Sequence, residues 1–386
     1  MNIQFWTHIP SPHQAAYIRE VAKSHAVTVI ADQRINAERE ALGWVKPDLG
    51  RAEVVVASNS SLALALAHAG GDPIQLLSGY RGCAMSSLVL RAAAHNARIG
   101  ILAEAGDFRG ISGVLRKARC CWDVARNRPR VDFVLAMGSL GETWWAGSGF
   151  RGDRIFPFGY VVEAPRTIQA PSMRAESPFR LMFLGRLVEC KGLELLLSAL
   201  ALCKRQAWQA AFVGSGPLES SCRKRAAHTG IAGRIAFVPS LPYDEAMKLL
   251  AQADLLVLPS RYDGWGAVVN EALMRGVPVI CSSACGASDL IQYPWLGSVV
   301  AANSAERLRQ ALSEWIGRGP RTPELSDRIR TWSHCIGGPS MASYFLRVLE
   351  CVYEGGPRPV APWRVPSFKT KESRQHCIYA DLPIGV

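Results

Sequence analysis

The chain has 386 residues, of which 49% are hydrophobic and 20% charged, a composition typical of globular proteins. The length predicts two domains, and no run of about eighteen apolar residues indicates a membrane-spanning helix. The 44 Lys and Arg residues outnumber the 32 Asp and Glu residues, and the resulting charge of +12 favours anionic partners such as diphosphates or acidic lipid surfaces. Nucleic acid is not expected as a partner, because no binding module or basic stripe with interleaved aromatic residues is present.

Short apolar segments alternate with helical patterns from the start of the chain, which is typical of α/β proteins with parallel sheets. Strands are expected at 3–7, 27–31, 54–57, 74–77, 99–103 and 133–137. The chain begins in a strand-like segment without the features of a signal peptide. We therefore expect a cytoplasmic protein, with peripheral attachment to the inner membrane face left open.

A polar segment with prolines, 163–178, predicts a linker after a first domain that spans 1–162. A second domain over 179–335 is expected to hold strands at 179–184, 210–213, 235–238, 255–258 and 277–281. Helical spacing predicts a late helix within 336–356 that packs back across the domains, and the Pro-rich, basic segment 357–386 predicts an extended or partly disordered tail. These elements predict two doubly wound, Rossmann-like α/β domains facing across a cleft, with ligands beyond the carboxyl ends of the strands.

The first strand of the second domain runs into Gly185, Arg186 and, after a short turn, Lys191. The helix that follows would point its first peptide N–H groups at this loop, and such groups favour anions. Arg offers a two-pronged donor for phosphate oxygens, and Lys offers a point charge. We predict that Arg186 and Lys191 stabilise a diphosphate leaving group, the alternative being two exposed surface cations.

A glycine turn, Gly214-Ser215-Gly216, follows the next strand and would let the backbone approach a ligand. The turn lacks the third glycine and the downstream acid of dinucleotide-binding proteins, so NAD binding is not expected. Gly214 and Gly216 are therefore candidates for binding the donor.

Two carboxylates, Asp263 and Glu271, flank the start of a helix after the fourth expected strand of the second domain. Gly264, Trp265 and Gly266 follow Asp263, and the small glycines would let amide groups approach a ligand. A carboxylate accepts hydrogen bonds from two neighbouring hydroxyls, so Asp263 is predicted to contact the sugar of a sugar nucleotide and Glu271 its ribose. The alternative is that Asp263 only caps the helix.

In order and spacing, Arg186, Lys191, the Gly214–Gly216 turn and the Asp263/Glu271 pair resemble the retaining GT-B glycosyltransferases of family 4. The resemblance implies two facing domains and a transferase that uses a nucleoside-diphosphate sugar. It also implies that the first acid contacts the transferred sugar and that the second holds the ribose.

The same resemblance implies that the backbone at Ser240 and Leu241 meets the base of the nucleotide. In the family the first acid of the pair is usually Glu, so Asp263, shorter by one methylene, is a departure that leaves the donor sugar open. The family needs no metal ion and no cofactor besides the donor, and the chain carries no Asp-x-Asp triplet.

Candidates in the first domain lie in loops after its strands, where they would face the cleft. Family members usually have a glycine-rich loop after the first strand, whereas this loop has no glycine, and Ser11 and His13 are its acceptor-side candidates. Many members have a His after a middle strand, where this chain has Glu104, which could accept a proton or stabilise charge on the sugar. Arg81 suits an anionic acceptor. The alternative for each is an ordinary solvated side chain.

We therefore expect a metal-independent hexosyltransferase that acts with retention in bacterial surface-polysaccharide or exopolysaccharide assembly. The expected acceptor is a saccharide or a lipid-linked saccharide near an anionic membrane surface. Two alternatives stay open, a sugar-nucleotide epimerase of similar fold and a non-catalytic protein that binds the nucleotide sugar.

Overall fold

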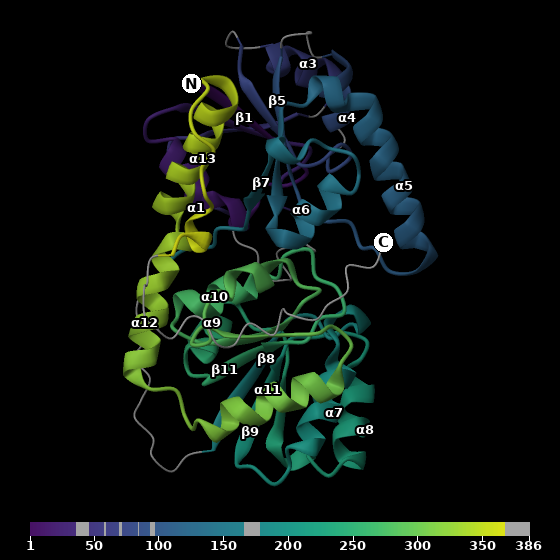
Figure 1. Ribbon diagram of the computed structural model, residues 1–386, viewed down its shortest axis with the longest axis vertical. Coiled ribbons are helices and arrows are strands. Elements are labelled where there is room, and N and C mark those ends of the chain that lie inside the picture. The colour runs from purple at the N-terminus through teal and green to yellow at the C-terminus, as the bar shows by residue number, and fades with distance from the viewer. Residues whose placement is uncertain are drawn as a thin grey trace.

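The computed structural model describes residues 1–35, 46–57, 59–68, 72–83, 85–92, 97–165 and 178–366. Within these residues the chain forms two parallel sheets, one in each half of the molecule (Figure 1). The first sheet has the order β3-β2-β1-β4-β5-β6-β7, from β1 (Asn2–Thr7), β2 (Ala26–Ala31), β3 (Glu53–Val56), β4 (Ile74–Leu77), β5 (Arg98–Ala103), β6 (Phe133–Met137) and β7 (Ile155–Phe158). The second has the order β10-β9-β8-β11-β12-β13, from β8 (Phe179–Leu184), β9 (Trp208–Val213), β10 (Ile235–Val238), β11 (Leu255–Leu258), β12 (Val279–Ser282) and β13 (Gly297–Val300). The expected fold class, two doubly wound α/β domains, is confirmed.

Helices cover both faces of each sheet (Figure 1). Those of the first half are α1 (Pro12–Val21), α3 (Ser60–His68), α4 (Ser86–Ala92), α5 (Gly110–Asn127) and α6 (Gly138–Ala146). Those that follow β8 are α7 (Leu193–Leu202), α8 (Glu219–His228), α9 (Tyr243–Ala251), α10 (Val268–Met274), α11 (Ala305–Gly317), α12 (Pro323–Ser333) and α13 (Gly338–Tyr353). Because helices shield both faces, the central strands are apolar throughout, as in the fully buried runs of β6 and β11.

Two strands, β7 and β13, were not expected from the sequence. β7 contains Pro157, which lacks a donor for a neighbouring strand, and β13 begins with Gly297 and Ser298, which favour strands weakly. Each is the last strand of its sheet. An edge position tolerates such residues because one side of the strand needs no partner.

The strand order places the ligand-binding crevice of each sheet. The order reverses between β1 and β4 in the first sheet and between β8 and β11 in the second. Helices on either side of such a reversal leave in opposite directions, which opens a crevice beyond the carboxyl ends of the two strands. The loops after β8 and β11 carry most of the donor-binding candidates, so the topology brings these candidates to one crevice.

The late helix α13 follows α12 of the second half but lies against α1 of the first (Figure 1). The Tyr344 hydroxyl donates a hydrogen bond to the carbonyl oxygen of Pro157 at 2.9 Å, and the Phe345 ring lies 5.9 Å from that of Phe5. The chain therefore crosses between the two halves a second time.

The first residues of the C-terminal segment are anchored. Trp363, in the short 3-10 helix η7 (Pro362–Arg364), is 2% exposed, and its indole N–H donates to Asp289 at 2.9 Å. Arg364 donates to Asp289 at 2.7 Å and to Glu142 of α6 at 2.5 Å. One guanidinium thus joins both halves. Residues 367–386, and residues 166–177 of the expected linker, lie outside the described part.

Candidate functional site

The loops after β8 and β11 pack against each other, and together they carry the central candidate residues. Gly192 has φ of +68°, and a Cβ there would lie 2.2 Å from the carbonyl oxygen of Pro259, so only glycine fits. The Arg261 amide donates to the carbonyl oxygen of Cys190 at 2.7 Å. This contact holds the next residue, Lys191, at the end of η3 (Glu189–Lys191), beside the second loop.

Lys191 and Asp263 form the central ion pair of the site. The ammonium nitrogen of Lys191 lies 2.5 Å from Oδ2 of Asp263, and the two side chains are 19% and 14% exposed. The Asp263 backbone is fixed by its amide, which donates to the carbonyl oxygen of Ala284 at 2.9 Å. Two of the residues predicted from the sequence are thus in direct contact, on neighbouring loops. The structure also shows that Asp263 is engaged by Lys191 and does not act as a helix cap.

Glu104, from the first sheet, lies next to the loop that carries Asp263. It follows β5, and its carboxylate lies so close to Gly264 that a Cβ there would fall 1.9 Å from Oε2. Burial raises the pKa of Glu104, the Tyr160 hydrogen bond lowers it, the charge of Asp263 raises it, and that of Lys191 lowers it. Since burial is the largest cause, the carboxyl group holds its proton more strongly than an exposed Glu.

Tyr160 contacts two of the candidate residues, and the sequence analysis did not single it out. Its hydroxyl donates to Oε1 of Glu104 at 2.6 Å, and its ring stacks on His13 at 5.3 Å. The Asn270 side-chain amide holds the Tyr160 carbonyl oxygen at 2.9 Å. Tyr160 comes two residues after β7, so recognition of that edge strand would have marked it as a strand-end residue facing the cleft.

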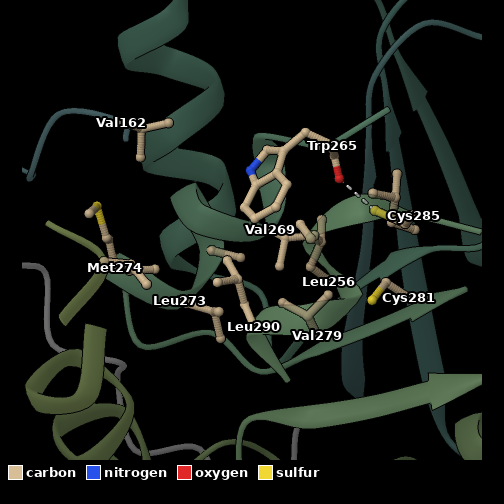
Figure 2. Close-up of a cluster of buried hydrophobic side chains, with 14 of the residues drawn as sticks. Val162, Leu256, Trp265, Val269, Leu273, Met274, Val279, Cys281, Cys285 and Leu290 are labelled. Carbon is tan, nitrogen blue, oxygen red and sulfur yellow. Dashed lines mark hydrogen bonds between the residues drawn. The ribbon is translucent and has the colours of Figure 1, made fainter. Parts of the chain in front are cut away.

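The Trp265 indole is enclosed by protein instead of facing a ligand. It is 1% exposed, and its N–H donates to the Asn270 side chain at 2.8 Å. Figure 2 shows it among apolar side chains, with its carbonyl oxygen accepting the Cys285 thiol at 2.8 Å. A Cβ at Gly159 would lie 2.6 Å from the ring. The sequence assigned Trp265 to donor binding, but in the structure its side chain joins the two halves.

The glycines at the ends of β8 and β9 let two loops approach each other. A Cβ at Gly214 would lie 2.0 Å from the carbonyl oxygen of Gly185, and one at Gly216 would lie 2.4 Å from that of Leu187. Gly266, at φ of +90°, adopts a backbone conformation that other residues rarely take. These glycines therefore allow the loops to pack closely. This packing does not by itself show contact with a ligand.

Arg186 is exposed at the carboxyl end of β8, and it forms no ion pair with any carboxylate in the described residues. Its charge is thus available to an anion in the crevice. Ser240 is exposed and its amide donates to the Ser215 hydroxyl at 3.1 Å, while Leu241 is half-buried against the core.

Glu271 lies in α10 with its side chain buried, and the residue is 7% exposed. Burial raises its pKa to about 7, against the smaller opposing effects of the Arg275 charge and of a hydrogen bond with Tyr243. In this conformation its carboxyl group faces Tyr243. Contact with a ribose would require Glu271 to exchange that partner or to share it.

We expect Glu271→Gln to stabilise the unliganded protein at alkaline pH. A carboxyl group whose folded pKa is raised favours folding below its ordinary pKa of 4.5, and this advantage is lost as the pH rises to about 7. Glutamine carries no charge to bury, so at pH 8 the gain should approach about 3 kcal/mol and should vanish near pH 4. Urea titrations at both pH values measure it. Exposed Glu314→Gln is the control, and an equal gain at both pH values would contradict the prediction.

The acceptor-side candidates are placed differently from one another. Ser11 caps α1, since its hydroxyl accepts a hydrogen bond from the His13 amide at 3.2 Å. The His13 ring stacks on that of Tyr160. Arg81 makes a two-pronged contact with Asp123 of α5, both bonds being 2.8 Å, so its charge is already balanced. Of the three, His13 alone contacts the Glu104–Tyr160 pair.

Metal-binding clusters and membrane-spanning helices were sought in the described residues. No group of three or more His, Cys, Asp and Glu side chains is arranged to hold a metal ion there. No helix in the same residues has the length and apolar character needed to cross a bilayer.

Two facing, doubly wound domains with the site between their switch points define the GT-B fold, and this chain has it. Anabaena Alr3699/HepE, solved in complex with UDP, matches 91% of this chain and 100% of its own, with a TM-score of 0.68 and 18% identity. Residues 166–332 match the family described as "Glycosyl transferases group 1". The chain therefore has the GT-B fold, and its residues 166–332 are similar to the group 1 glycosyl transferases.

The sequence matches to curated relatives cover only part of each chain. A GDP-mannose-dependent alpha-(1-6)-phosphatidylinositol monomannoside mannosyltransferase of Mycobacterium tuberculosis is 32% identical over 53% of this chain and 54% of its own length. The amylovoran biosynthesis glycosyltransferase AmsK of Erwinia amylovora is 27% identical over 35% of each chain. The chain thus spans about half the length of the first of these relatives and about a third of the second.

Proposed function

We propose that this protein transfers a sugar from a nucleoside-diphosphate sugar to an acceptor hydroxyl with retention, as a family 4 enzyme. The observation that carries the proposal is the Lys191–Asp263 ion pair at the switch point of the second sheet, with Glu104 of the first sheet packed against the same loop. A cation and two acids from two domains thus surround one crevice, where an anionic leaving group and a polyol can meet them.

The roles follow from the positions. Exposed Arg186 and the Lys191 ammonium neutralise the departing diphosphate, which is charge stabilisation by groups already in place. Asp263 orients the sugar hydroxyls, and Glu271 holds the ribose once its carboxyl group turns from Tyr243. Retention places the acceptor on the face of the leaving group, where a diphosphate oxygen takes the acceptor proton. Glu104, held by Tyr160, stabilises the positive charge that develops on the sugar ring.

The names of similar proteins support the substrate class. The Mycobacterium relative is named for transfer from GDP-mannose to a phosphatidylinositol mannoside, and AmsK is named for biosynthesis of amylovoran. For this chain we propose a saccharide or lipid-linked saccharide acceptor in bacterial glycan assembly, with the enzyme at a membrane surface.

The test is a product assay with radiolabelled nucleotide sugars, run with and without candidate acceptors. Transfer of label to an acceptor with retained anomeric configuration supports the proposal. Conversion to another nucleotide sugar without acceptor would show an epimerase instead. Thermal stabilisation by a nucleotide sugar with neither transfer nor hydrolysis would show a protein that only binds it, because a ligand of the native state stabilises it by mass action.

A further inference from the structure

Helix α5 turns an apolar face to solvent. Four large apolar side chains are strongly exposed, Ile111 at 82%, Val114 at 68%, Leu115 at 66% and Trp122 at 57%. Their spacing along the helix places them on one side, and we call this set the apolar stripe of α5. In Figure 1 the helix runs along the outer edge of the first half. A surface helix ordinarily turns such a stripe toward the core.

The opposite side of α5 is fixed to the protein, so the helix cannot roll to hide the stripe. Gly113 and Val124 are buried on that side. The Lys117 ammonium donates to the carbonyl oxygen of Trp144 at 2.6 Å and lies 4.5 Å from the centre of its ring. Asp123 is held by Arg81, as described above. The outward orientation of the stripe is thus a property of the fold.

The charges around the stripe are of one sign. Arg119 and Arg126 are exposed beside it, and Arg128 and Arg130 follow the helix. Asp123 is the one acid in residues 110–130, all of them described, and it is buried and paired. An apolar surface bordered by unbalanced cations matches an anionic lipid surface, where side chains enter the acyl boundary and Arg meets phosphate.

We propose that the apolar stripe of α5 docks the protein on an anionic bilayer, with the helix in the plane of the interface. A second copy of the chain is a poorer occupant, because pairing two such faces would bring like charges together. Trp122 suits the interface, because an indole has an apolar body and a polar N–H.

Docking would bring the site to the membrane. The segment before α5 starts at Glu104, and its exposed Phe108 packs edge-on against Tyr262, 6.1 Å away, in the loop that carries Asp263. An exposed aromatic ring next to the start of α5 thus contacts the loop that carries Asp263. This consequence, unlike the docking itself, rests on the proposed function, since it concerns delivery of a lipid-linked acceptor.

The test is co-sedimentation of the full chain with phosphatidylcholine vesicles that contain or lack phosphatidylglycerol, without donor or acceptor. We expect pelleting with the anionic vesicles, reduced by salt. Combined Ile111→Ser, Val114→Ser, Leu115→Ser and Trp122→Ser should weaken partitioning on the order of 100-fold. The matched control is Leu202→Ser with Val360→Ser, two exposed apolar residues elsewhere, which should pellet like the native chain.

A charge variant separates lipid docking from other associations. Arg119→Gln with Arg126→Gln should weaken partitioning roughly 25-fold, since each cation near an anionic surface contributes about fivefold. Absence of pelleting, or equal pelleting by the serine variant, would overturn the proposal. A native dimer in light scattering that becomes a monomer in the serine variant would also overturn it, because the stripe would then bind a second copy of the chain. Vesicle binding involves no sugar transfer, so it stands or fails separately from the proposed reaction.

Discussion

Replacing Lys191 by methionine is expected to lower kcat by about 1,000-fold, the largest effect predicted for one cation of the site. The ammonium lies 2.5 Å from Oδ2 of Asp263, where under the proposed mechanism it would meet the charge that develops on the leaving diphosphate. Methionine keeps the length of the side chain and removes the charge. Steady-state rates with the best donor found in the product assay measure the effect.

Two controls separate catalysis from folding in this experiment. Lys224→Met removes an exposed lysine of α8 and should leave kcat unchanged. Urea unfolding of Lys191→Met reports how much stability is lost when Asp263 loses its partner, so that rates can be compared where both proteins are folded. A kcat within about twofold of the native value would remove Lys191 from the proposed mechanism.

Replacing Glu104 by glutamine is expected to lower kcat by about 100-fold to 10,000-fold and to remove the acid limb of the pH–rate profile. Burial raises the pKa of Glu104, so the ionised form accumulates only above the ordinary range of a Glu. Activity that depends on this form rises with pH through the raised pKa. Glutamine has no proton to lose, and that dependence should disappear while donor binding remains.

Tyr160→Phe tests the role of the same carboxyl group in a second way. This substitution should shift the acid limb of the pH–rate profile, whereas Glu104→Gln should remove it. The Tyr160 hydrogen bond lowers the pKa of Glu104, so its removal should move the acid limb to higher pH. Tyr353→Phe is the matched control, because Tyr353 donates to the carboxylate of Asp132 at 2.9 Å away from the site. A purely structural Tyr160 would lower stability without moving the limb, and that outcome would contradict the assignment.

The sequence predicted the parts of the site that depend on local pattern. Apolar runs followed by glycine loops identified the loops after β8 and β11, and hence Lys191 and Asp263, whose contact follows from sheet topology. It did not predict the partners of side chains from distant elements. Arg81 was expected to suit an anionic acceptor, because its partner Asp123 comes 42 positions later, on α5, and no local pattern connects the two. Trp265 was a donor-binding candidate because it stands between two glycines, and no local pattern indicated that the distant Gly159 makes room for its ring.

The return of α13 makes the first domain discontinuous in sequence. Its aromatic core joins Tyr17 and Phe158 to Phe345, with ring centres 5.3 Å and 5.9 Å from that of Tyr17. A fragment ending in the linker would lack Phe345 and leave an apolar face of α1 uncovered. The first domain therefore completes its core only after the second has been synthesised, and an exchange of this domain between related proteins would have to include α13.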